Sequence, residues 1–237
     1  MALRRGPTLR HSAGVSGAFP ASAQVIVHVV DPSEIAEPKA VLAAGEVELA
    51  ARFRFEKDAV HWRACRAALR RILGAALDCA PEAVVIETGE HGKPFVVEAH
   101  PRLQFNLSHC HDLALVALCA EGPVGVDIES ADRAHSLLGC EGSFCHPDEI
   151  EGLPANEDER AAALLDLWTR KEALLKALGT GMSLAPETVS LADPAFPHPL
   201  LLPFAVRRLE HPALAGHLAH LAHPHACSTV EIAVFQG

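Results

Sequence analysis

Hydrophobic residues recur along the chain in two patterns, and each pattern predicts a different kind of element. The segment Gln24–Val30 is almost continuously apolar, which is typical of a buried strand and marks where order is expected to begin. Apolar residues then recur at helical spacing from Asp58 to Leu77 and from about Asp158 to Leu178, where Gly179 follows as a stop signal. The chain is therefore expected to hold two long helices, far apart in sequence.

Shorter segments with strand-like character surround the two predicted helices. They lie at residues 84–87, 94–97, 113–120, 124–129, 204–208, 218–222 and 230–235. Gly122 and Pro123 break the chain in the middle of this series. We therefore expect an N-terminal half at residues 24–121 and a C-terminal half at residues 122–237, each with one long helix and several strands. This order of elements predicts an α+β fold with antiparallel strands.

Residues 1–23 form a leader with a different composition. The segment is rich in Ala, Gly and Ser and carries Arg4, Arg5 and Arg10, while the first acidic residue is Asp31. Such a composition predicts a disordered leader. An organellar transit peptide would have the same features, so both interpretations stay open.

The charge of the chain limits its partners. The formal net charge of −10 argues against nucleic acid as the main partner, because phosphate neutralisation needs a basic face. Seven of the 20 Lys and Arg nevertheless fall between Arg52 and Arg71, opposed there only by Glu56 and Asp58. This local basic patch favours a small anionic ligand.

Cysteine usage and hydropathy indicate the compartment. The seven cysteines include no Cys-x-x-Cys pair, which favours a reducing cytoplasm. No apolar run reaches the roughly 18–20 residues that span a bilayer, so no membrane partner is expected. Five histidines near the C-terminus lack the spacing of a closed zinc site, and so does the group of Cys140, Cys145 and His146. The five are His211, His217, His220, His223 and His225.

Asp127 and Glu129 are the first candidates for chemistry. They lie two residues apart in a predicted strand, so both carboxylates project from the same face. Two adjacent carboxylates repel each other unless a cation or a proton lies between them. Magnesium suits such a pair, because it binds through one or two carboxylates together with substrate phosphates. A solvated strand edge is the simpler alternative.

Further candidates lie on the second helix and on two turns. Glu172 and Lys176 are i, i+4 neighbours beside Trp168, either as part of a site or as an ordinary surface ion pair. Lys171 falls within the apolar arc of the same helix, where its stem could snorkel or its ammonium could reach an anion. Elsewhere, Ser108 and His109 could hold a phosphate, and Lys93 follows a turn glycine.

Taken together, these segments resemble the Sfp-type 4'-phosphopantetheinyl transferases. The resemblance covers about residues 52–183 and rests on motifs in the family's order and approximate spacing. The motifs are Gly92-Lys93-Pro94, Phe105-Asn106-Leu107-Ser108-His109, Val124-Gly125-Val126-Asp127-Ile128-Glu129, and Trp168-x-x-Lys171-Glu172-x-x-x-Lys176 ending in Gly179-x-Gly181-x-Ser183.

The resemblance implies a fold and an activity. It implies a pseudo-dimer of two similar α+β halves with coenzyme A in the cleft between them. The implied reaction moves the 4'-phosphopantetheine arm of coenzyme A to a serine of an apo carrier protein, and the implied enzyme is a monomer that uses Mg²⁺. The residues do not indicate whether that carrier serves fatty acid, polyketide or nonribosomal peptide synthesis. A non-catalytic module of the same fold that binds coenzyme A or a carrier protein is the alternative, as is another magnesium-dependent phosphohydrolase.

The resemblance also implies roles for individual residues. Asp127, Glu129 and Glu172 would bind the metal, with Asp127, Glu172 and Lys176 as the catalytic set. The implied contacts to coenzyme A are Arg52, Lys93, Pro94, Ser108, His109 and Lys171. Two lysines that the family's prototype places near the ribose 3'-phosphate fall here on Glu46 and Leu49. Arg66 is therefore expected to take over that contact, with Arg63 and Arg70 as alternatives.

Overall fold

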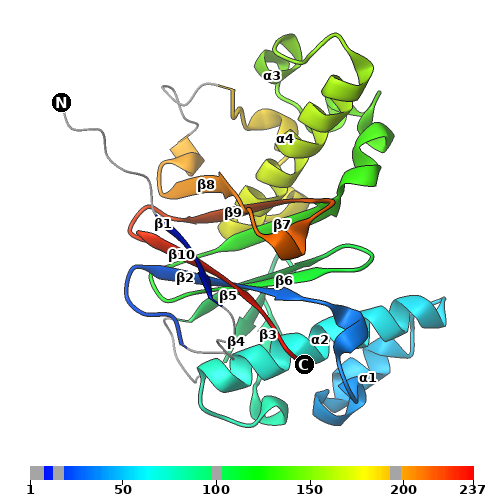
Figure 1. The fold of residues 1–237 in the computed structure, drawn as a ribbon, viewed down its shortest axis with the longest axis vertical. Coiled ribbons are helices and arrows are strands. Elements are labelled where there is room, and N and C mark those ends of the chain that lie inside the picture. Colours follow the sequence, from blue (N-terminus) through cyan, green and yellow to red (C-terminus); the bar gives the residue numbers. More distant parts are fainter. Residues whose placement is uncertain (1–7, 13–18, 98–102, 193–198) are drawn as a thin grey trace.

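The computed structural model describes residues 8–12, 19–97, 103–192 and 199–237, and these residues build four stacked layers (Figure 1). Two β-sheets lie face to face in the middle. Helix α2 covers the outer face of the five-stranded sheet, and helix α4 covers the outer face of the three-stranded sheet. Because each long helix packs on its own sheet, and most strand pairs of the described residues are antiparallel, the expected α+β class with two similar halves is confirmed.

The α-helices in this part of the chain are α1 (Ala44–Ala50), α2 (Glu56–Ala76), α3 (Pro147–Glu151) and α4 (Glu157–Leu178). The strands of the five-stranded sheet are β1 (Thr8–Ser12), β2 (Gln24–Val30), β5 (Gln104–His109), β6 (Ala114–Cys119) and β10 (Thr229–Val234). The three-stranded sheet contains β7 (Gly125–Ser130), β8 (Phe204–Arg208) and β9 (His217–Pro224). A separate hairpin pairs β3 (Ile86–Thr88) with β4 (Pro94–Val96).

The five-stranded sheet contains both ends of the described chain. Its strand order is β1-β10-β2-β6-β5, with β6 antiparallel to both β2 and β5. Strand β10 pairs in parallel with β2 and β1, although it follows the whole C-terminal half in sequence. The last strand thus returns to the sheet of the first half, and the expected boundary at residues 121–122 stays a prediction.

Strand β1 corrects the expectation of a disordered leader at residues 1–23 for the segment 8–12. Residues 8–12 pair in register with residues 229–233 of β10, so backbone hydrogen bonding to an otherwise open edge orders this segment. Residues 19–23 are also described, with an N-terminal turn that leads into β2. The remaining leader residues, 1–7 and 13–18, lie outside the described part of the chain.

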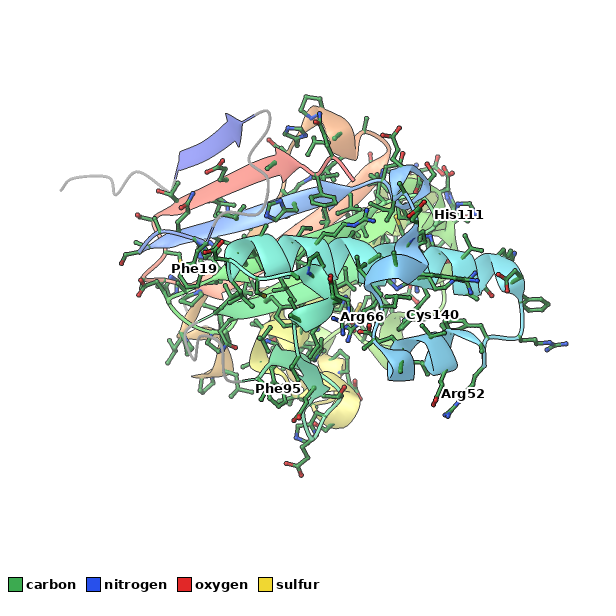
Figure 2. All side chains as sticks on the ribbon, turned by 90° about the horizontal axis from the view of Figure 1, so that it is seen from below. Phe19, Arg52, Arg66, Phe95, His111 and Cys140 are labelled. Atoms are coloured by element: carbon green, nitrogen blue, oxygen red, sulfur yellow. The ribbon has the colours of Figure 1, made fainter. Side chains whose placement is uncertain are left out.

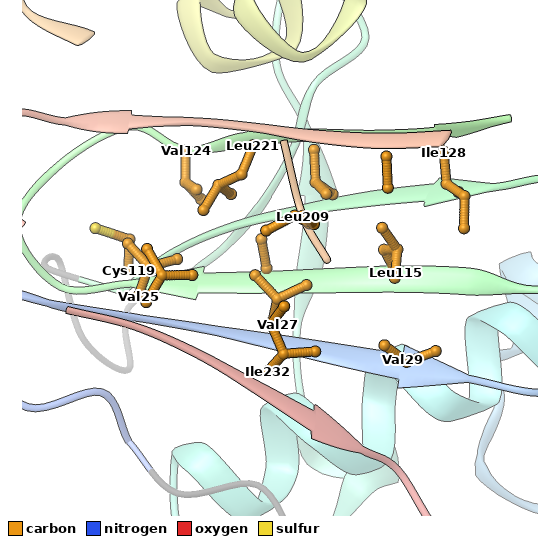
Figure 3. Packing of buried hydrophobic residues seen from close by; sticks show 14 of the residues in the cluster. Val25, Val27, Val29, Leu115, Cys119, Val124, Ile128, Leu209, Leu221 and Ile232 are labelled. Atoms are coloured by element: carbon orange, nitrogen blue, oxygen red, sulfur yellow. The ribbon is translucent and has the colours of Figure 1, made fainter. Parts of the chain in front are cut away.

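The two sheets share one hydrophobic core. Figure 3 shows Val25, Val27 and Leu115 from the five-stranded sheet facing Ile128 and Leu221 from the three-stranded sheet. Every second residue of β7, Val126 and Ile128, points into this core and is at most 1% exposed. Since side chains alternate along a strand, Asp127 and Glu129 must face the opposite side, toward α4.

Close packing of β7 against α4 fixes the position of those carboxylates. A Cβ atom added to Gly125 would lie 2.0 Å from the Ala173 carbonyl oxygen and 2.3 Å from the Ala177 amide nitrogen. Only glycine permits this approach of strand to helix backbone. Helix α4 begins with an Asn156 cap, whose side chain accepts a hydrogen bond from the Glu159 amide, and ends at Gly179 in the left-handed conformation (φ 72°).

Neither long helix of the described residues, nor any other helix there, is both long enough and apolar enough to cross a membrane. All seven cysteines are free thiols.

Candidate active site at the junction of the two sheets

The site lies where the edge strands β5 and β7 of the two sheets meet. The Asn106 side-chain carbonyl accepts a hydrogen bond from the Val126 amide at 2.9 Å, and the Ser108 hydroxyl accepts one from the Ile128 amide at 3.3 Å. Side chains of β5 thus satisfy the backbone of β7 where no strand pairs with it. The junction holds Ser108 beside Asp127 and lets both take part in one site.

Asp127 is buried, and its two carboxylate oxygens differ in their surroundings. Its Oδ1 accepts hydrogen bonds from the Ser108 hydroxyl at 2.9 Å and from Lys176 Nζ at 2.6 Å, and Lys176 Nζ also donates to Ser108 Oγ at 3.0 Å. Its Oδ2 is buried without a hydrogen-bond partner among the described residues. A buried carboxylate oxygen in that state is costly unless a cation or a donor binds it.

Glu129 and Glu172 bring two more carboxylates to the site. Glu129 accepts a hydrogen bond from Trp168 Nε1 at 3.3 Å and pairs with Arg133. Burial raises the pKa of Glu129, and the nearby Asp127 carboxylate raises this pKa further. Burial also raises the pKa of Glu172; Lys176 lowers it, and the carboxylates of Asp127 and Glu129 raise it. Both pKa values are therefore raised chiefly by burial, and repulsion between the neighbouring carboxylates adds to the effect.

One cavity of about 240 Å³ unites these groups. Its charged and polar lining consists of Ser108, His109, Asp127, Glu129, Trp168, Glu172 and Lys176. Three carboxylates, one with an unpartnered buried oxygen, form the all-oxygen donor set that Mg²⁺ prefers. The residues present therefore fit a magnesium ion.

Lys93 and Pro94 lie at the same junction but do not line this cavity. Lys93 Nζ donates to the carbonyl oxygens of Val124 and Ala177, each at 3.1 Å, and so ties the β3–β4 turn to β7 and to the end of α4. Burial lowers the pKa of Lys93 to about 8. Pro94 is half-buried at the start of β4. Whether either residue contacts coenzyme A stays a prediction.

The arginines expected to contact coenzyme A lie on or beside α1 and α2. Arg52 is exposed in the turn between the two helices (Figure 2). Arg66 pairs with Glu46, which also accepts a hydrogen bond from Arg70 Nε at 2.6 Å, and Arg63 pairs with Glu56 at 2.5 Å. Glu46 stands where the family's prototype has one of its two lysines, and it pairs with Arg66, the residue expected to replace those lysines. A contact between Arg66 and a 3'-phosphate stays a prediction and would compete with Glu46.

Lys171 requires a correction, because the structure does not bring it to the cavity. Its side chain is about 2% exposed, and its Nζ lies 2.6 Å from Glu149 Oε2. The same ammonium donates to the carbonyl oxygens of Phe144 at 2.7 Å and Pro186 at 3.0 Å. With three acceptors around it inside the protein, this lysine does not snorkel, and the anionic group that it reaches is the Glu149 carboxylate and not a ligand in the cavity. It holds α3 against α4 instead.

Several residues of the site were absent from the sequence-based expectations. Asn106 joins the two sheets, and Arg133 balances Glu129. His61 on α2 lies against His109, with ring centroids 5.1 Å apart. Asn106 belongs to a motif already singled out, so its position was an available signal. Arg133 and His61 are brought to the site by tertiary packing, and no local sequence pattern marks them.

Comparisons with known proteins identify the family. Residues 123–230 match the model of the 4'-phosphopantetheinyl transferase superfamily, and residues 31–121 match that of the 4'-phosphopantetheinyl transferase N-terminal region. The 4'-phosphopantetheinyl transferase HetI of Nostoc sp. is 33% identical over 168 residues, which cover 70% of this chain and 71% of HetI. The chain therefore belongs to the 4'-phosphopantetheinyl transferase superfamily, and the resemblance of its motifs is confirmed.

Two further relatives match over smaller shares. A protein of Synechocystis sp. that bears the provisional name of a 4'-phosphopantetheinyl transferase is 34% identical over 147 residues, or 61% of this chain and 60% of that protein. The 4'-phosphopantetheinyl transferase psf-1 of Bacillus pumilus is 36% identical over 135 residues, or 56% of each chain. The chain thus matches between just over half and about seven-tenths of the length of these relatives.

Proposed function

We propose that this protein transfers the 4'-phosphopantetheine moiety of coenzyme A to a serine of an apo carrier protein and releases adenosine 3',5'-bisphosphate. The observation that carries the proposal is the convergence of Asp127, Glu129, Glu172 and Lys176 with Ser108 and His109 on one cavity. A module that only binds coenzyme A would not need this set of three acids and a lysine.

In the proposed reaction the carrier serine hydroxyl attacks the β-phosphorus of coenzyme A. The new bond joins the serine oxygen to that phosphorus, and the bond from the phosphorus to the bridging oxygen breaks, which frees adenosine 3',5'-bisphosphate. Glu172 accepts the hydroxyl proton, a role that its raised pKa suits, since burial favours a carboxylate that binds protons more readily. Lys176 turns from Asp127 toward the transferring phosphate and balances its charge.

The carboxylates of Asp127, Glu129 and Glu172 would hold Mg²⁺ at this site. When bound, the ion neutralises pyrophosphate charge and helps to orient it. Ser108 and His109 border the same cavity from β5 and would bind phosphate oxygens. Arg52, Lys93, Pro94 and Arg66 would extend the contacts to the rest of coenzyme A.

We also propose a class of carrier protein, a cellular compartment and an oligomeric state for the enzyme. The acidic chain, with its basic patch around α1 and α2, suits an anionic cofactor better than nucleic acid. Free cysteines suit a reducing cytoplasm. We propose that the enzyme works there as a monomer on an acyl, peptidyl or aryl carrier.

Mass spectrometry of the carrier tests the proposed transfer. The protein is incubated with coenzyme A, Mg²⁺ and an apo carrier protein, and the carrier is expected to gain the mass of one phosphopantetheine group. A carrier with its acceptor serine changed to alanine is the control and should gain nothing. A binding module would bind coenzyme A but leave both carriers unchanged, which would refute the proposed activity.

A further inference from the structure

A group of soft metal ligands lies beside the active-site cavity, on its α2 side. His61 and Cys65 stand at i and i+4 on α2, and His109 ends strand β5. One ligand atom from each residue lies within 4.8 Å of the other two. The proposed reaction gives His61 and Cys65 no role, and it gives His109 only a contact to phosphate.

The distance between the ligand atoms of His61 and Cys65 matches that in a zinc site. His61 Nε2 lies 3.5 Å from Cys65 Sγ. Zinc binds sulfur at about 2.3 Å and imidazole nitrogen at about 2.0–2.1 Å, so tetrahedral geometry separates two such ligands by about 3.5 Å.

The surroundings give an ion access to this group. His61 and His109 line a second cavity of about 770 Å³, which lies between α2, the β5–β6 turn and the β8–β9 connection. Figure 2 shows His111, from the same turn, near the N-terminal part of α2. Cys65 lies behind the histidines and is 1% exposed. Two ligands at the cavity wall and a buried thiol leave the fourth position open to a water molecule.

We propose that His61, Cys65 and His109 bind a zinc ion, separately from the carboxylates of the magnesium site. Two imidazoles and one thiolate select a borderline or soft cation over Mg²⁺, which prefers oxygen. Binding removes the proton of the Cys65 thiol and releases it to solvent. Because His109 is also a proposed coenzyme A contact, an ion here withdraws that side chain from the cofactor. Only this consequence rests on the proposed function.

Cobalt substitution tests the site without any measurement of activity. The metal-free, reduced protein is titrated with Co²⁺ in excess Mg²⁺, and one thiolate-to-cobalt charge-transfer band with tetrahedral d–d bands is expected. Cys65→Ser should remove the charge-transfer band and weaken binding by more than the ~10–100-fold that loss of an outer hydrogen-bond partner costs. Zinc should displace the cobalt and abolish all of these bands.

The matched control is Cys110→Ser, because Cys110 belongs to a neighbouring group with Asp112 and His217. That variant should keep the band. The proposal is overturned if the wild-type protein gives no thiolate band, if Cys65→Ser retains it, or if Cys110→Ser alone loses it. A failure of carrier labelling leaves the cobalt result unchanged, so the two hypotheses can fail independently.

Discussion

Asp127 shows how one side chain can serve both the stability of the fold and the chemistry of the site. Its Oδ1 binds Lys176 and Ser108, while its Oδ2 has no partner among the described residues. The first oxygen supports packing between β7, β5 and α4. The second is left for a ligand that the protein itself does not supply. Substitutions at this residue should therefore affect stability and turnover together.

Asp127→Ala is expected to reduce carrier labelling to background. Because adjacent carboxylates repel each other, removal of one of them would by itself be expected to raise stability at low Mg²⁺. The Lys176 contact at 2.6 Å reverses this expectation, because the variant leaves a partly buried ammonium without its carboxylate. The free energy of unfolding should fall by about 1–3 kcal/mol in urea titrations. Asp132→Ala, at an exposed residue, is the control and should change neither quantity. Full turnover by Asp127→Ala with Mg²⁺ would refute the assignment.

Glu172→Gln separates proton transfer from metal binding. Glutamine keeps the shape and one oxygen but loses the basicity. If Glu172 is the base, kcat should fall by about 10²–10⁴-fold while coenzyme A affinity stays nearly constant. If it is chiefly a ligand, excess Mg²⁺ should restore much of the loss. Steady-state kinetics across a magnesium titration distinguish the two, with Glu157→Gln on an exposed turn of α4 as control. Normal kcat at ordinary Mg²⁺ would contradict both roles.

At the scale of elements, the contact between β7 and α4 determines where the carboxylates stand. Gly125→Ala would place a methyl group 2.0 Å from the Ala173 carbonyl oxygen, so strand and helix must separate. We expect a loss of several kcal/mol in the free energy of unfolding, about 3 or more, as for severe overpacking, together with a fall in kcat as Asp127 moves. Gly45→Ala, exposed in α1 with open space around it, should instead stabilise the protein by about 0.5–1 kcal/mol. Equal stability of the two variants in urea melts would show that β7 tolerates the displacement.

The α3–α4 contact allows a test of the corrected role of Lys171. Lys171→Met removes an ammonium that three buried acceptors hold, and it leaves Glu149 without its ion-pair partner. Loss of one partner of a buried pair costs about 3–5 kcal/mol. The free energy of unfolding should fall by this order, while the KM for coenzyme A, measured at a temperature where the variant is folded, should not change. A large rise in KM with unchanged stability would restore the original assignment.

At the scale of the molecule, local patterns predicted the elements better than their partners. The two long helices and the strand Gln24–Val30 appear within two residues of their predicted starts, because each carries its own apolar periodicity. The outward face of Asp127 and Glu129 followed from the alternation of a strand. The return of β10 to the first sheet and the pairing of Lys171 with Glu149 join residues distant in sequence, so no local pattern could reveal them. The same holds for His61 beside His109, which only tertiary packing brings together.

Lys93 connects the two halves and gives the molecule a distinctive dependence on pH. Lys93 lies in the β3–β4 turn, yet its ammonium donates hydrogen bonds to the carbonyl oxygen of Val124, just before β7, and to that of Ala177 at the C-terminus of α4. The helix dipole favours a cation at that end of α4. Burial lowers its pKa from 10.5 to about 8. Between these two values the unfolded chain binds more protons at this residue than the folded protein does. The contribution of Lys93 to the free energy of unfolding therefore increases as pH rises from about 8 to about 10.5.

The variant Lys93→Met removes this titration, so the difference in unfolding free energy between wild type and variant should grow in favour of the wild type across that window. Below pH 8 both the folded and the unfolded chain carry the charge, and the difference should be constant. Urea titrations with reductant at several pH values measure it, with Lys39→Met at an exposed residue as the control that should show no such trend. A difference that stays flat, or that shrinks as pH rises, would mean that the two carbonyl oxygens and the helix dipole hold the Lys93 ammonium at least as strongly as water does.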